Sequence, residues 1–207
     1  MPAQALKQVI LRSLRRGWKA DLLRDEIHRQ LDAFEDHMER PPAHIDGHQH
    51  IHALPQIREA LLDIVQHRYT DHPPVIRSTR FGGAAPTLRD TFKGRVIQSL
   101  GAGALHTAAT YASLPITHAL LGVYNFDADA PNYLRHMKRW MSVARSDDLI
   151  MVHPAACVQP QEPLGIQRKI EFDVLFGSAI DNVLKQAQRH IAPGMPTMTS
   201  HGANLAA

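Results

Sequence analysis

The chain has 207 residues, of which 44% are hydrophobic and 21% are charged, and its formal net charge is +3. This length can bury one sizeable core, and the single cysteine, Cys157, excludes an internal disulfide and a cysteine-based zinc site. The sequence has no bilayer-spanning apolar run and no nucleic-acid-binding motif, so we expect a cytoplasmic protein without membrane insertion or a nucleic-acid partner.

In chain order, the predicted elements alternate between helices and short strands. Amphipathic periodicity predicts helices over 20–39, 55–68, 89–112, 131–144 and 166–190, and apolar runs predict strands over 43–47, 75–78, 120–126 and 149–152. Such alternation is typical of a parallel sheet covered by helices, open or closed into a barrel. We see no linker, so we expect a single domain over 1–207, with a poorly ordered tail over 193–207.

Four histidines and one aspartate fall within residues 44–52, which read HIDGHQHIH. Strand alternation places His44, Asp46 and His48 on one face of an extended segment. His48 is the last of these at a strand-to-helix connection, so we expect it to be a metal ligand, because imidazole is a common ligand of divalent transition metals. His50 and His52 are expected to support it from the following loop. The alternative is a set of surface histidines without a common partner.

Two further strand ends carry candidate residues. His153 follows the apolar strand 149–152 directly, where a β/α barrel places catalytic groups. A capping or core histidine is the alternative at this position. Arg77 and Arg80 flank the end of the strand 75–78 and could bind a carboxylate, a phosphate or a sugar hydroxyl, although exposed arginines often bind nothing specific.

Several of these segments together resemble one known family. The HIDGHQHIH motif and the following LPQIREAL over 54–61 resemble the histidine motif of YdjC-like carbohydrate deacetylases, a family that includes chitooligosaccharide deacetylases and hopanoid-biosynthesis-associated proteins. Further segments agree in order: IRSTR over 76–80, LGVYNF over 121–126, LIMVHP over 149–154, and 168–175, which contains Glu171. The resemblance covers about 19–190.

The resemblance implies a barrel-like (β/α) fold of the polysaccharide-deacetylase and glycosidase type. It also implies a hydrolase that removes acetyl groups from N-acetylated sugars or glycolipids with a divalent metal, magnesium or zinc. The residues implied are His48 and His50 at the metal, His153 and Asp46 in catalysis, and Arg77, Arg80 and Tyr124 at the substrate.

Two family features have no counterpart in the printed sequence: a first strand ending in paired aspartates, and a later Gly-x-His segment. We therefore expect a chain that resembles the C-terminal two thirds of the family, with an incomplete barrel that lacks the first strands. Uncovered apolar surface would then favour a homodimer. We expect impaired deacetylase activity, and the alternative is an inactive remnant or a histidine-rich metal-binding protein.

Overall fold

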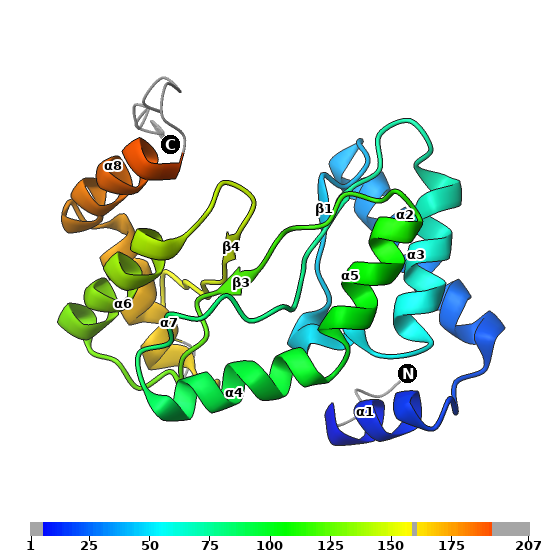
Figure 1. Ribbon diagram of the computed structural model, residues 1–207, viewed down its shortest axis with the longest axis horizontal. Helices are drawn as coiled ribbons and strands as arrows, with labels where there is room; N and C mark the ends of the chain where they lie inside the picture. The colour runs from blue at the N-terminus through cyan, green and yellow to red at the C-terminus, as the bar shows by residue number, and fades with distance from the viewer. Residues whose placement is uncertain (1–5, 159–160, 192–207) are drawn as a thin grey trace. The chain divides into compact units, whose positions relative to one another are not determined.

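The structure is a computed structural model that describes residues 6–158 and 161–191. Within these residues the fold is mixed α/β, mostly helical, with two small parallel sheets (Figure 1). The chain forms two compact units. The first comprises 1–123 with 147–151, and the second comprises 124–146 with the residues from 152 onward. All four strands belong to the first unit.

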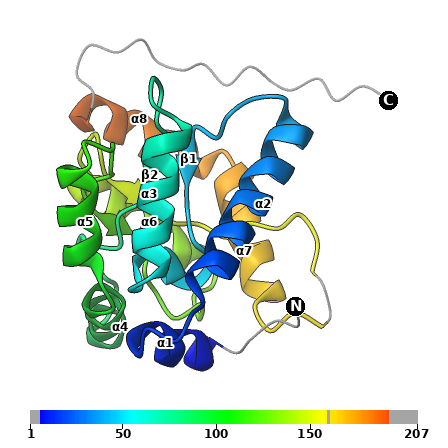
Figure 2. The ribbon, with the colours of Figure 1, turned by 90° about the vertical axis from the view of Figure 1, so that its right-hand side faces the viewer.

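The first unit begins with two helices, α1 (Leu6–Leu14) and α2 (Ala20–Met38). Helix α2 confirms the prediction from apolar periodicity, and it ends at Glu39, whose left-handed backbone (φ 51°) lets its N–H donate to the carbonyl of Glu35. Helix α3 (Ile57–Arg68) lies between α2 and α5 (Ala102–Tyr111) (Figure 2). Their facing apolar side chains form the core of this unit with the strand residue Ile76: Leu31, Leu61, Leu62, Ile64, Val65, Leu105 and Ala109.

The strands are shorter than the sequence predicts. Strand β1 (His44–Ile45) pairs in parallel with β2 (Val75–Ile76), and β3 (Leu120–Leu121) pairs in parallel with β4 (Leu149–Ile150). Parallel bridges also join Ile76 to Ile116 and Phe81 to Leu120. The parallel arrangement confirms the alternating pattern, and the described residues form no closed barrel.

Glycines explain two of the differences from the predicted boundaries. The expected strand 120–126 ends early, because Gly122 adopts φ 87° with the backbone of Met151 so close that a Cβ would lie 2.2 Å from its carbonyl oxygen. The expected helix 89–112 is two helices, α4 (Leu88–Ser99) and α5, separated at Gly101. Gly101 has φ 138°, and a Cβ there would lie 2.2 Å from the carbonyl oxygen of Ala53. A single continuous helix is therefore the wrong prediction here.

The second unit packs α6 (Ala130–Val143) against α7 (Gly165–Phe176) and α8 (Ala179–Ile191). Helix α6 starts where predicted, because the carboxylate of Asp129 accepts a hydrogen bond from the N–H of Asn132 at 2.8 Å. The expected helix 166–190 is interrupted at Gly177, which has extended backbone angles. The buried side chains of this unit include Tyr133, Met137, Trp140, Ile180 and Val183. The expected tail 193–207 lies outside the described residues.

None of the described helices combines the length and apolar character needed to cross a bilayer.

Candidate functional site

The histidine motif forms a tight turn after β1. The expected extended segment stops at Ile45, and residues His48–Ala53 form a short 3₁₀ turn (η1). Within it Gln49 (φ 52°) and His50 (φ 65°) adopt left-handed backbone angles, which are uncommon for residues with a side chain. A Cβ on Gly47 would lie 2.6 Å from the Nδ1 atom of His52, so this close approach requires glycine.

His52 is the buried centre of the turn, with 2% of its side chain exposed. Its Nδ1 accepts a hydrogen bond from the Gly47 N–H at 3.1 Å, and its Nε2 lies 2.8 Å from the carbonyl oxygen of Arg77. These partners assign the proton to Nε2 and leave the ring without a nitrogen for a metal. Burial, followed by the nearby Arg77 charge, lowers the pKa of His52 to about 4, so the ring is neutral at neutral pH.

Arg77 connects the turn to β2. Its N–H donates to the carbonyl of Ile45 at 3.0 Å, and only 2% of its side chain is exposed. The Nη2 atom contacts a carboxylate oxygen of Asp46 and lies 3.1 Å from the Nδ1 of His50. The Nε and Nη1 atoms are buried without a hydrogen-bond acceptor among the described residues. Unmatched donors on a buried guanidinium are costly. The contacts that hold the Arg77 side chain, with Asp46 and His50, both involve its Nη2 atom.

His48 is exposed, and its side chain forms no hydrogen bond or ion pair with the described residues. His48 does not belong to a group of three potential ligands. The described residues hold one close group of three histidine or carboxylate ligands, and that group does not include His48. A catalytic zinc ordinarily has three protein ligands. The described residues around His48 therefore do not complete such a metal centre by themselves.

A second polar group lies in the second unit and is centred on Glu171 of α7, which is fully buried. Its carboxylate accepts hydrogen bonds from the hydroxyl of Tyr124, from the hydroxyl of Tyr133 at 3.2 Å and from the backbone N–H of His153 at 2.5 Å. The Nδ1 of His153 lies 4.0 Å from a Glu171 oxygen, and one third of the imidazole is exposed. Glu171 thus fixes the position of His153 while the ring still reaches the surface.

The tyrosines beside Glu171 are strongly perturbed. Burial raises the pKa values of Tyr124 and Tyr133, and the neighbouring Glu171 carboxylate raises both further. Both hydroxyls therefore stay protonated and act as donors to Glu171. Tyr124, expected at the substrate, is 2% exposed and packs its ring 4.8 Å from that of Phe126. The Tyr124 hydroxyl thus donates to Glu171, and its expected role at the substrate stays a prediction.

The structure thus brings the predicted site residues together in two groups. Asp46, His50 and Arg77 meet in the first unit, and Tyr124 and His153 meet through Glu171 in the second. Arg80 is exposed. Its backbone N–H donates to the hydroxyl of Ser78 at 3.2 Å, and its carbonyl accepts from the N–H of Leu120 at 2.7 Å.

Sequence reasoning expected His52 to support His48 from the loop, but it did not find the contacts of His52 with Gly47 and Arg77 or the role of Glu171. For Glu171 a signal existed, because an acidic residue among the apolar positions of α7 needs donors when it is buried.

Comparison with known proteins gives one family and two relatives. A family model described as "YdjC-like protein" matches residues 4–186. Over 44 residues the chain is 39% identical to proteins named "Carbohydrate deacetylase" from Mus musculus and from Homo sapiens. These alignments cover 21% of the chain and 14% of each relative, so the matched part is a small share of either relative. No solved structure matches the chain.

Proposed function

The chain belongs to the YdjC-like family, and we propose that it contributes to the removal of acetyl groups from an N-acetylated sugar or glycolipid with a divalent metal, magnesium or zinc. The family match and the relatives' names support a carbohydrate substrate. The observation that carries the proposal is the exposed His48 on a turn that is anchored by His52 and Arg77. These contacts hold the backbone of the turn, so His48 projects from a defined position of the chain.

In this proposal each residue has one role. His48 is the proposed metal ligand that this chain supplies, and His50 and Asp46, from the same motif, both contact Arg77. Amide hydrolysis needs an activated water and a proton for the leaving amine. Asp46 is the carboxylate proposed to accept a proton. His153 keeps the catalytic role that the family resemblance implies, with Glu171 as its positioning residue. When bound, the metal would polarise the acetyl carbonyl and acidify water.

We expect the activity of this chain to be low. The described residues supply His48 without two further ligands, and the Asp46 carboxylate is engaged by Arg77. Loss of a positioned base alone typically lowers a rate by about 10²–10⁴-fold. A metal-binding protein without hydrolytic activity is therefore the second candidate, and the engagement of the Asp46 carboxylate by Arg77 favours it.

Acetate release from N-acetylglucosamine oligomers separates the two candidates. The assay is run with added zinc, magnesium or manganese, and with a chelator as a blank. The deacetylase proposal predicts slow, chelator-sensitive release that disappears in His48→Ala and persists in His44→Ala, a matched exposed histidine of the same motif. Metal binding without any acetate release would favour the second candidate. Release that survives both the chelator and His48→Ala would contradict the proposed role of His48.

A further inference from the structure

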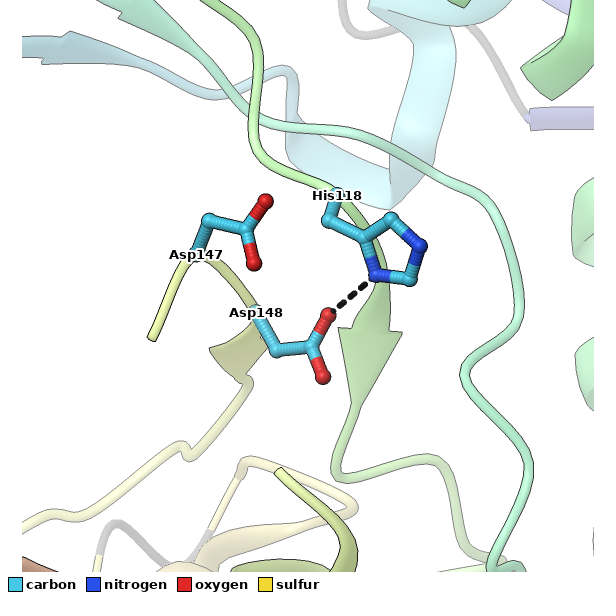
Figure 3. A group of neighbouring side chains, drawn as sticks. All are labelled: His118, Asp147 and Asp148. Atoms are coloured by element: carbon cyan, nitrogen blue, oxygen red, sulfur yellow. Dashed lines mark hydrogen bonds and ion pairs between the residues drawn. The ribbon is translucent and has the colours of Figure 1, made fainter. Parts of the chain in front are cut away.

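Another histidine–carboxylate group involves none of the residues assigned above. His118 precedes β3, and Asp147 and Asp148 directly precede β4, so the parallel pairing of these strands brings the three side chains together (Figure 3). One ligand atom from each residue lies within 4.8 Å of the ligand atoms of the other two. The Nδ1 of His118 is 2.8 Å from a carboxylate oxygen of Asp148, and the Asp147 carboxylate points toward the same space.

The backbone holds this group in place. The N–H of His118 donates to the carbonyl of Asp147 at 2.8 Å, and the N–H of Leu149 donates to the carbonyl of Ala119 at 2.9 Å. Two consecutive bonds of a parallel ladder therefore fix the positions from which the three side chains project. The Asp148 side chain is 6% exposed, whereas 36% of the His118 side chain is exposed. One carboxylate is thus enclosed by protein, and the imidazole and Asp147 border the solvent.

These distances are close to those of a metal centre. Zinc binds nitrogen and oxygen at about 2.0–2.2 Å, which puts neighbouring tetrahedral ligands roughly 3.3 Å apart. The His118–Asp148 contact would have to open by about half an ångström, and the exposed Asp147 side chain would have to swing inward by up to about 1.5 Å. Both movements are rotations of side chains, because the backbone ladder already sets the spacing.

We propose that His118, Asp147 and Asp148 form a second divalent-metal site, which takes Zn²⁺ through one imidazole and two carboxylates. One nitrogen and two oxygens suit zinc, whereas magnesium and calcium prefer oxygen ligands alone. A bound ion would join the segments that begin β3 and β4, so this site would stabilise the sheet and leave one coordination position for water. This site does not depend on the proposed deacetylase function.

Zinc titration of the full chain tests the site. The probe is ZnCl₂, followed by isothermal titration calorimetry and by the unfolding temperature. We expect zinc affinity at this site to fall at least about tenfold in Asp147→Asn and in His118→Ala, with loss of the zinc-dependent rise in unfolding temperature. Asp147→Asn alters an exposed side chain, so it keeps the test valid if His118→Ala weakens the fold. His72→Ala, in an exposed loop next to Asp71, is the control and should leave binding unchanged.

The titration is repeated in His48→Ala to separate the two sites. The proposal predicts that this variant keeps the zinc equivalent that Asp147→Asn removes. If neither Asp147→Asn nor His118→Ala alters zinc affinity or the stabilisation, the three residues form an ion pair only and the proposal fails. An equal loss in His72→Ala would show scattered binding to surface histidines and would also overturn it.

Discussion

The Nε2 atom of His52 lies 2.8 Å from the backbone carbonyl oxygen of Arg77, and this buried contact joins the histidine motif to the strand beside it. Because the opposite ring nitrogen accepts from Gly47, one neutral imidazole connects three points of the chain. The side chain of Arg77 extends to the same turn, where its Nη2 atom contacts Asp46 and His50. His52 is therefore the structural centre of the motif, and His48 is its exposed member.

Replacement of His52 should destabilise the fold. His52→Ala leaves the Gly47 N–H and the Arg77 carbonyl without their partner and opens a cavity, so we expect a loss of about 2–4 kcal/mol in the free energy of unfolding. The measurement is urea unfolding followed by circular dichroism. His44→Ala, at an exposed site in the same motif, should stay within about 0.5 kcal/mol of the parent chain. Equal stability of the two variants would contradict the buried role of His52.

The same residue predicts a pH dependence. The pKa of His52 falls from 6.5 when unfolded to about 4 when folded, so the unfolded chain binds the proton more tightly. The stabilisation by the neutral His52 is therefore complete above about pH 6.5. As the pH falls toward 4, the free energy of unfolding decreases by roughly 3 kcal/mol. Urea unfolding at several pH values compares the parent with His52→Asn, which cannot titrate at this position. Parallel stability profiles of the two proteins over this range would refute the assignment.

Gly47 should not tolerate a larger residue. In Gly47→Ala the new Cβ would lie 2.6–2.7 Å from Nδ1, Cβ and the backbone N of His52, so we expect a loss of about 1–3 kcal/mol in stability. Gly103→Ala is the control, because its Cβ would meet no atom within 4 Å and the site is helical. That variant should be neutral or more stable by up to about 1 kcal/mol. A stable Gly47→Ala protein would show that the turn is looser than described.

Glu171→Gln tests the second polar group. The new side-chain amide carries two N–H donors, which would face the three donors that now bind the carboxylate. We therefore expect a loss of about 1–3 kcal/mol in the free energy of unfolding. The pKa values of Tyr124 and Tyr133 should also fall, because part of their rise comes from the carboxylate. Ultraviolet tyrosinate absorbance during an alkaline titration measures this change. Asp173→Asn, on the exposed side of the same helix, should change neither property.

Local sequence patterns predicted most helices, because apolar side chains at helical spacing determine which face is buried. The start of α6 at Asp129 and Pro131 and the extent of α2 follow from such patterns. The break between α4 and α5 and the end of β3 did not follow from them, because Gly101 and Gly122 act through contacts with Ala53 and Met151, which are distant in sequence.

The candidate site, like the fold, could be predicted from the sequence only in part. The importance of the HIDGHQHIH motif could be predicted from residue types alone. The separate roles of its histidines could not, since they depend on which ring meets Arg77 after the strands pair. The group of His118, Asp147 and Asp148 was missed because it requires the register between β3 and β4.

The most direct test of the account is the metal content of His48→Ala. The variant is prepared together with His44→Ala in a His118→Ala background, so that the second proposed site does not contribute, and bound metal is measured by elemental analysis after incubation with zinc or magnesium. We predict that His48→Ala loses most of the remaining bound metal while His44→Ala retains it. Equal metal content in the two proteins would contradict the assignment of His48 as the metal ligand of this chain.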